Sequence, residues 1–195
     1  NYVGGQDCVI QNIAKNMLYS DPFLGYLDSV CKEQVSFEYN EHAERLSNNA
    51  KRSKEFAYLY ESSSALCKLM SVKYGLGAKT RKAYMNKDKK LLKEVIDDYY
   101  KAEELLQIFY KKFKILWFEE NKPHGFDVQD IRLGGLLFRL KSCKERLIDY
   151  MDGKIDNIPE LDEKLLDFWG NGEEFKKQSP CLNEWHIIST VNRMI

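Results

Sequence analysis

Apolar side chains recur at alternating spacings of three and four residues along most of the chain, which is the period of an amphipathic helix. Three runs carry this pattern, over residues 43–67, 92–116 and 133–150. The first run predicts one long helix from about Ser36 to Gly75, and its small side chains would let another helix approach closely. No run alternates between apolar and polar residues with a period of two, so the sequence predicts no strand.

Capping residues and helix breakers predict where these helices begin and end. Asp88 fits an N-cap ahead of the second long helix, which must end before Pro123 because proline lacks a backbone N–H. The third long helix is expected to begin near Asp127 or Asp130. Gly153 lies just beyond its end, at a position where glycine is the preferred residue.

Shorter helices complete the predicted fold, one over 78–85 and one that begins after Pro159. Short connections favour antiparallel packing, so the predicted fold is all-α, an elongated antiparallel bundle of three long helices plus shorter helices. The whole chain is expected to form a single domain. Its expected parts are a loop-rich lead-in (1–35), the helical bundle (36–170) and a docking tail (171–195).

Composition excludes several classes of function. Thirty basic and thirty acidic residues cancel, so the chain has no overall charge that would attract nucleic acid or an anionic membrane. Its apolar runs are shorter than the ~20 residues that span a bilayer, and no signal peptide is visible. The five cysteines are widely spaced and the three histidines are scattered, so no metal site, cofactor or redox motif is expected. Reduced cysteines favour a cytoplasmic protein, and a chain that begins at Asn1 is expected to be part of a longer one.

Four carboxylates, a histidine, two arginines and three glycines crowd the turn FEENKPHGFDVQDIRLGGLLFRL (118–140), which lies between two apolar runs. Glu119 and Glu120 are adjacent at the end of a helix, so their side chains point about 100° apart and cannot face one substrate together. Asp127 and Asp130 occupy positions typical of N-caps and first-turn acids. A structural role therefore explains these carboxylates better than catalysis does.

Gly134 and Gly135 follow in the same stretch, inside the third predicted helix. A glycine in a helix interior costs about 1 kcal/mol relative to alanine. That cost is offset if a neighbouring helix, or another domain, packs closely against the bare backbone. Arg132, just ahead of the pair, can form a forked bond with a carboxylate such as Asp130 or one supplied by a partner.

Long blocks of the sequence resemble one known family. The stretch 117–161, and above all ENKPHGFDVQDIRLGGL (120–136), closely resembles the C-terminal helical domain of a bacterial subgroup of the family 20 glycoside hydrolases, the β-N-acetylhexosaminidases. Further similar blocks are LYSDPFLGYLD (18–28), LCKLMSVKYGLGAKTRKAY (66–84) and NEWHIISTVN (183–192). The resemblance therefore covers nearly the whole chain.

The resemblance implies a parent enzyme with a catalytic (β/α)8 barrel that removes terminal β-linked N-acetylglucosamine or N-acetylgalactosamine. The implied mechanism is retaining and substrate-assisted, because the acetamido oxygen of the sugar attacks the anomeric carbon. In that family the catalytic glutamate and a neighbouring aspartate lie at the end of a barrel strand. Asp162 and Glu163 match this dipeptide but fall in the first turn of a predicted helix, so no catalytic residue is assigned here.

The chain is accordingly expected to be a non-catalytic accessory domain that buttresses the barrel of the same polypeptide and contributes to contacts in a homodimer. The turn 117–135 is the expected docking element. Its expected contributors are Trp117 and Phe126 as apolar anchors, Asp130 and Arg132 as partners in charged bonds, Gly134 and Gly135 as sites of close approach, and the connecting Asn121 and Lys122. Two alternatives stay open: an independent helical adaptor for a protein partner, or a weak carbohydrate-binding module whose aromatic rings stack on a sugar.

Overall fold

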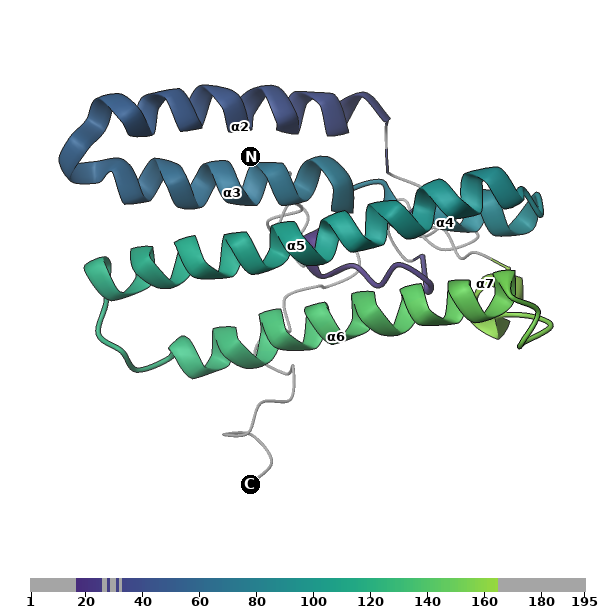
Figure 1. The fold of residues 1–195 in the computed structure, drawn as a ribbon. Coiled ribbons are helices and arrows are strands. Elements are labelled where there is room, and N and C mark those ends of the chain that lie inside the picture. Colours follow the sequence, from purple (N-terminus) through teal and green to yellow (C-terminus); the bar gives the residue numbers. More distant parts are fainter. Residues whose placement is uncertain (1–16, 26–27, 29–30, 32, 165–195) are drawn as a thin grey trace, which may run out of the picture.

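The computed structural model describes residues 17–25, 28, 31 and 33–164 of the chain (Figure 1). The elements assigned within this part are all helical and confirm the predicted all-α class. In chain order they are α2 (Glu33–Ser53), the 3-10 helix η2 (Lys54–Phe56), α3 (Ala57–Lys73), α4 (Leu76–Met85), α5 (Lys89–Glu120), α6 (Phe126–Met151) and α7 (Pro159–Asp162). The expected docking tail, 171–195, lies outside the described residues, as does much of the lead-in.

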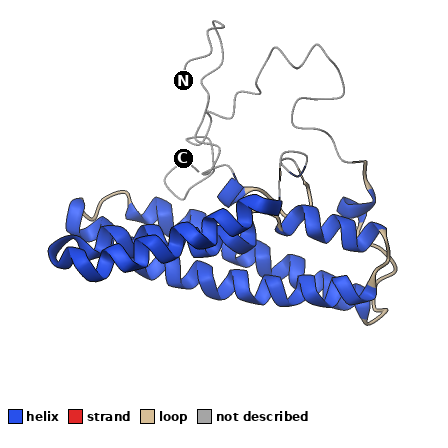
Figure 2. Cartoon of the chain, turned by 90° about the horizontal axis from the view of Figure 1, so that it is seen from above, coloured by secondary structure: helices blue, strands red, loops and turns tan. Residues whose placement is uncertain are grey.

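The four longest helices lie side by side in the order α2, α3, α5 and α6, and each runs antiparallel to the next (Figure 1). The main contacts in this row join α2 with α3, α3 with α5, and α5 with α6. Seen from above, the row forms one elongated body (Figure 2). The shorter α4 packs on α5 and α7, at the end of the row away from the α5–α6 turn. Among the described elements, α6 is therefore the last helix of the row.

The single long helix predicted over 36–75 is wrong, because the chain reverses direction between α2 and α3. Lys54 takes a positive φ of 42° at the reversal. The two helices then pack so closely that the hydroxyl of Ser64 donates a hydrogen bond of 2.7 Å to the backbone carbonyl of Ala43. The seam of small side chains does permit a close helix approach, but the partner is the other half of the same run.

The predicted helix ends are largely confirmed. The Asp88 carboxylate caps α5 by accepting hydrogen bonds from the backbone N–H groups of Lys90 and Leu91, both at 3.0 Å. The helix ends at Glu120, before Pro123. Gly153 follows α6 with a φ of +72°, which is the left-handed conformation expected beyond a helix end.

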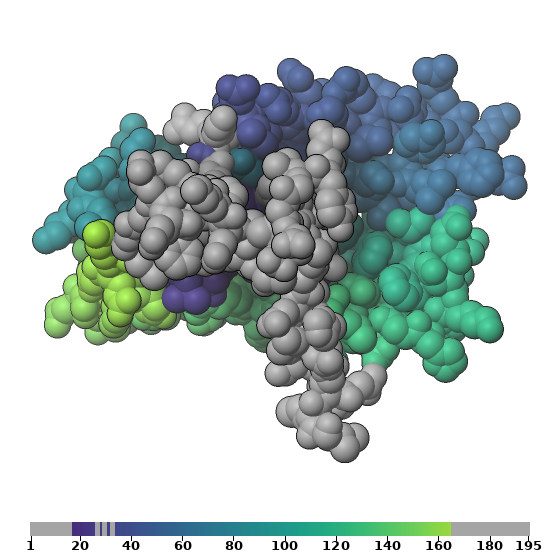
Figure 3. Space-filling view, turned by 180° about the vertical axis from the view of Figure 1, so that it is seen from behind, coloured from purple at the N-terminus to yellow at the C-terminus, as the bar shows by residue number. Residues whose placement is uncertain are grey.

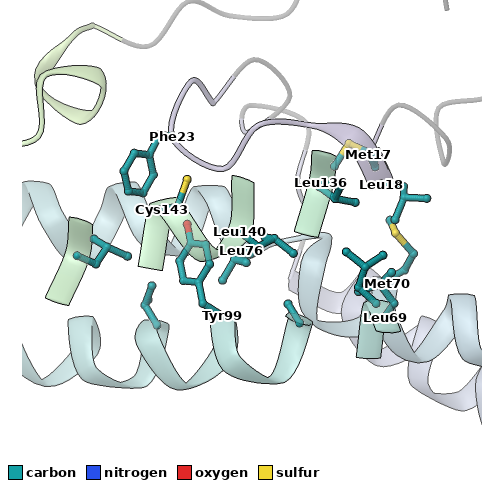
Figure 4. Packing of buried hydrophobic residues seen from close by; sticks show 14 of the residues in the cluster. Met17, Leu18, Phe23, Leu69, Met70, Leu76, Tyr99, Leu136, Leu140 and Cys143 are labelled. Atoms are coloured by element: carbon teal, nitrogen blue, oxygen red, sulfur yellow. The ribbon is translucent and has the colours of Figure 1, made fainter. Parts of the chain in front are cut away.

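The hydrophobic core joins the helices to the lead-in (Figure 4). On α5 and α6 the positions predicted to face inward form its centre. Their fully or nearly fully buried members are Leu92, Val95, Tyr99, Ala102, Leu106, Phe109, Leu133, Leu136, Leu140, Cys143 and Leu147. Met17, Leu18 and Phe23 of the lead-in are buried with them. The described part of the lead-in is thus a component of the core.

None of the helices in the described part has the length and apolar character required to cross a membrane.

Candidate functional site

Aromatic rings hold together the turn between α5 and α6. The ring centroid of Phe126 lies 5.7 Å from that of Trp117, 6.1 Å from Phe113 and 5.4 Å from Phe118. The indole Nε1 of Trp117 donates a hydrogen bond of 3.1 Å to the carbonyl oxygen of Lys122. Phe126 is buried and Trp117 half-buried. The two expected apolar anchors therefore fasten the turn internally, and their contact with another domain stays a prediction.

The predicted start of α6 near Asp127 is confirmed, since the helix begins at Phe126 and Asp127 is an acid of its first turn, but the N-cap is Gly125 and not an aspartate. Gly125 has a φ of +93°, and a Cβ at this position would lie 3.5 Å from the Trp117 ring. The Asp127 carboxylate reaches back to accept a hydrogen bond of 3.1 Å from the N–H of Gly125. Asn121 follows the last residue of α5 in an extended conformation and is exposed. Only glycine adopts the required backbone at position 125 without strain.

Asp130 forms a bond between the two helices. Its carboxylate accepts a hydrogen bond of 2.7 Å from the hydroxyl of Tyr110 on α5, and this bond raises the pKa of Tyr110. Arg132 lies near Tyr19 of the lead-in, where its charge opposes the rise in the Tyr19 pKa that burial causes. Asp130 thus lies within α6 and not at its cap, and the role of both residues toward a partner domain stays a prediction.

The glycine pair lies on the outward side of α6. A Cβ built on Gly134 or Gly135 would meet no atom within 4 Å. Ile131 and Phe138 lie three or four residues from the glycines, on the same side of the helix. Phe138 is 70% exposed, and Gly135 is also exposed. We call Ile131, Gly134, Gly135 and Phe138 the α6 outer face. Among the described residues no neighbouring helix packs against the glycines, and contact with another domain stays a prediction.

A second cluster, not predicted from the sequence, joins the lead-in to the helices. The guanidinium of Arg139 on α6 donates two hydrogen bonds to the carboxylate of Asp21, at 2.6 and 3.0 Å. The same carboxylate accepts hydrogen bonds from the backbone N–H groups of Phe23 and Leu24, at 2.8 and 3.1 Å. Burial acts to raise the pKa of Asp21, but Arg139 and the two amides outweigh it, so this pKa lies below its usual value.

Two arginines of α6 also cover the ring of Phe23. The guanidinium carbons of Arg139 and Arg146 each lie 5.5 Å from the ring centroid. Arg146 is held in place by an ion pair with Glu160 at the start of α7. The ring itself is fully buried. Cation–π attraction strengthens when the cation is desolvated, so these contacts add to the hydrophobic contribution of Phe23.

Arg81 of α4 binds the lead-in and α7 at once. Its guanidinium donates to the carbonyl oxygen of Phe23 at 2.6 Å and to that of Leu161 at 3.1 Å. Its Nε lies 4.0 Å from Oδ2 of Asp28, and neither atom has a hydrogen-bond partner among the described residues. Lys73 of α3 donates a hydrogen bond of 2.7 Å to the carbonyl oxygen of Ser20. We call Asp21, Asp28, Lys73, Arg81 and Arg139 the charged junction.

The charged junction perturbs two of its own groups strongly. Burial raises the pKa of Asp28 to about 6, although Arg81 and Lys73 act in the opposite direction. Burial also lowers the pKa of Lys73 to about 8, against the effect of Asp21 and Asp28. Below pH 8 the lysine is therefore charged, and the carboxyl of Asp28 changes its protonation near pH 6.

Replacing Asp28 by asparagine is expected to remove a pH dependence of stability. A pKa raised from 3.8 to about 6 in the folded chain means that the contribution of Asp28 is present below pH 3.8 and lost as pH rises through about 6. Wild type should therefore lose stability over this range while the variant does not. The free energy of unfolding of Asp28→Asn, relative to that of wild type, should rise by about 2–3 kcal/mol between about pH 4 and 6.5. Urea denaturation followed by circular dichroism at each pH measures this gain. A difference between the two proteins that stays constant with pH would contradict the prediction.

Sequence reasoning missed the charged junction because its partners are far apart in the chain. Asp21 and Arg139 are separated by 118 positions, and Lys73 and Ser20 by 53. Neither separation produces a periodic signal. The one available signal was the position of these residues, since Asp21 and Asp28 lie in the block 18–28 and Lys73 and Arg81 in the block 66–84.

Asp162 and Glu163, the acidic pair that matches the catalytic dipeptide of the family, make contacts that hold the fold together. The Asp162 carboxylate accepts hydrogen bonds from the hydroxyl of Tyr84 and the side-chain amide of Asn157, both at 2.8 Å. The carbonyl oxygen of Glu163 accepts a hydrogen bond of 3.1 Å from Arg81. In the described part of the chain, His, Cys, Asp and Glu side chains form no group of three or more that could hold a metal ion. The features that stand out are therefore a structured turn, an uncovered helix face and a charged junction.

Comparison with protein families gives one match that spans most of the chain. A family model described as the glycoside hydrolase 20C C-terminal domain matches residues 4–179. A comparison with curated proteins gives no match. The matched range contains the turn, the α6 outer face and the charged junction.

Proposed function

Because this chain belongs to the family of glycoside hydrolase 20C C-terminal domains, we propose that it is the non-catalytic helical domain of a β-N-acetylhexosaminidase. In this proposal the domain packs against the catalytic barrel of the same polypeptide and supports it, and contributes to contacts in a homodimer. The barrel removes terminal β-linked N-acetylglucosamine or N-acetylgalactosamine by a retaining, substrate-assisted mechanism. The free thiols of Cys31, Cys67 and Cys143 favour a reducing compartment such as the cytoplasm.

The α6 outer face is the observation that supports docking. Two helix-interior glycines cost about 1 kcal/mol each relative to alanine, and no described side chain fills the space beside them. Such a pair lets another segment approach the helix backbone more closely than any larger residue would allow. Phe138 beside it leaves 70% of its surface in water, and burying a phenylalanine contributes about 1.5–3 kcal/mol. A bare backbone flanked by apolar side chains is typical of a surface that another element covers.

The position of α6 in the row agrees with this proposal. Its inward side is filled by α5 and the lead-in, whereas its outer face has no neighbouring helix among the described elements (Figure 1). The catalytic domain is linked to this domain in one polypeptide, so its effective concentration at the face is high. The turn ahead of α6 then has a supporting role: Trp117 and Phe126 fix the direction in which the helix leaves the turn.

Replacing Phe138 by glutamate in the full-length enzyme is expected to weaken the hold on the catalytic domain. The charge would be buried in an apolar contact, and loss of the phenylalanine contact alone should speed thermal inactivation by about tenfold or more. The measurement is the half-life of the enzyme's activity at raised temperature, assayed by hydrolysis of a chromogenic N-acetyl-β-hexosaminide. The initial rate at 25 °C should not change, since no residue of this domain is assigned to the reaction.

Phe37 provides a matched control. It is 73% exposed on α2, at the opposite edge of the row, so Phe37→Glu makes the same chemical change away from the α6 outer face. The proposal requires that Phe138→Glu shortens the half-life and Phe37→Glu does not. Equal half-lives for the two variants would show that the α6 outer face makes no special contact.

A further inference from the structure

We propose that residues 17–25, together with Asp28, form a latch that closes on α3, α4 and α6 as one unit and opens while the row of helices stays folded. Figure 3 shows part of the latch in purple, on the face opposite to that of Figure 1, beside α6. The latch contributes both buried apolar side chains and charged bonds to this junction. Both sets of contacts have to be broken for the latch to open.

The polar contacts of the latch end on three different helices. Lys73 of α3 binds the carbonyl of Ser20, Arg81 of α4 binds the carbonyl of Phe23, and Arg139 of α6 binds the carboxylate of Asp21. Through the latch these bonds join α6 to α3 and α4, since α6 makes its main helix contact with α5 and not with α3 or α4.

Closure is cooperative because a half-open latch would leave charges buried without partners. Lys73 is 3% exposed, and the side chains of Arg81 and Asp28 are 12% and 8% exposed. A buried cation that loses its acceptor is strongly unfavourable unless water reaches it. Opening therefore has to release Lys73 and Asp28 to water together, and the apolar Phe23 with them, whereas Arg81 keeps its bonds to two carbonyl oxygens of α7.

Gly77 of α4 marks the place where the latch fits most tightly. A Cβ on Gly77 would lie 2.7 Å from Oδ1 of Asp28 and 3.1 Å from the carbonyl oxygen of Pro22. The second of these atoms belongs to the backbone, so the latch itself would have to shift. The glycine is thus required by the latch and not by α4, in which alanine is the better helix former.

The latch has a functional consequence that rests on the proposed function. In a C-terminal domain the catalytic part of the polypeptide is joined on the N-terminal side, ahead of the latch. The closed latch then fixes the entering chain to α6, the helix that carries the outer face. An open latch leaves the catalytic domain attached to the helices only through the connecting polypeptide and that face.

Hydrogen exchange of the full-length enzyme, read by mass spectrometry of its peptides, tests the latch. In Gly77→Ala, peptides that cover residues 18–25 are expected to exchange about ten- to hundredfold faster, because overpacking favours the open state. Peptides of α5 should exchange as in wild type. Lys82→Ala, an exposed change in the same helix, is the control and should leave both sets unchanged.

A second variant keeps the test decisive if Gly77→Ala does not fold. Arg139→Lys keeps the positive charge but cannot form the forked bond to Asp21, so it should speed exchange in the same peptides. Unchanged or slower exchange at residues 18–25 in the folded variants would overturn the latch. So would an equal increase over α5, since the segment would then unfold only with the whole domain. The exchange of catalytic-domain peptides tests the proposed function separately, because the test of the latch uses only the peptides of residues 18–25 and α5.

Discussion

Replacing Phe23 by alanine is expected to lower the free energy of unfolding of the chain by about 3–5 kcal/mol, one of the largest effects of any single substitution. The ring is fully buried in the core. The guanidinium carbons of two α6 residues, Arg139 and Arg146, each lie 5.5 Å from the ring centroid. Its removal leaves a cavity and takes away the cation–π partner of both arginines. Urea denaturation followed by the helix signal in circular dichroism measures the loss.

Leu24 provides the control for this substitution. It is the next residue in the chain and of similar size, but its side chain is 60% exposed. Leu24→Ala should therefore change the free energy of unfolding by no more than about 0.5 kcal/mol. If Phe23→Ala cost less than about 1 kcal/mol, the lead-in would not be a part of the core, and the latch would lose its apolar contribution.

Residues that follow the helical period were predictable from the sequence. The inward positions of α5 and α6 are buried as predicted, because a stripe with the spacing of Leu133, Leu136 and Leu140 can face only one direction on a helix. Asp88 was equally predictable, since its side chain bonds to backbone only two and three residues away. Local geometry decides both features.

The reversal between α2 and α3 was not predictable in the same way. Neither glycine nor proline marks it, and the positive φ falls on Lys54, which has no conformational preference for it. The apolar period also continues across the break, so Ala43 and Ser64 look like members of one stripe when they face each other from two helices. Contacts between the helices, and not local propensity, decide where the chain turns.

In the candidate site, too, features that depend on nearby residues were predictable, and features that depend on tertiary contacts were not. The glycine pair could be recognised because glycine is unusual inside a helix. The direction in which Phe126 points could not be predicted, since an aromatic residue near a turn can either pack within the domain or contact another one. Phe138 was overlooked because its exposure is evident only once the core side of α6 is known. Sequence therefore located the helix that carries the outer face, and the structure identified its flanking side chains.

The two surfaces of α6 are joined by consecutive residues. Phe138 points outward beside the glycine pair, and Arg139 points to the lead-in, where it binds Asp21. Successive residues of a helix project about 100° apart, so one helix turn serves both contacts. If the catalytic domain binds the outer face as proposed, it contacts the same helix turn that holds the latch.

Gly135→Leu is expected to have opposite effects on the helical domain and on the full-length enzyme. Within α6, leucine is a better helix former than glycine by about 0.5–1 kcal/mol, and a Cβ at this position meets no atom within 4 Å. Urea unfolding of residues 1–195 should therefore show a small gain in stability. In the enzyme the same side chain fills the space that the catalytic domain is proposed to occupy, and overpacking costs about 1–3 kcal/mol. The half-life of activity on heating should fall by about tenfold or more.

The sign change separates docking from any general effect of an added leucine. Glu104→Leu places the same side chain at an exposed position of α5, outside the α6 outer face, and should leave the half-life near that of wild type. A variant at position 135 that stabilised both the domain and the enzyme would show that the glycine pair has no partner. A loss of stability in the isolated residues 1–195 would show that the space beside Gly135 is filled by another part of this chain. Only a gain in the domain together with a loss in the enzyme agrees with a backbone kept bare for a neighbouring domain.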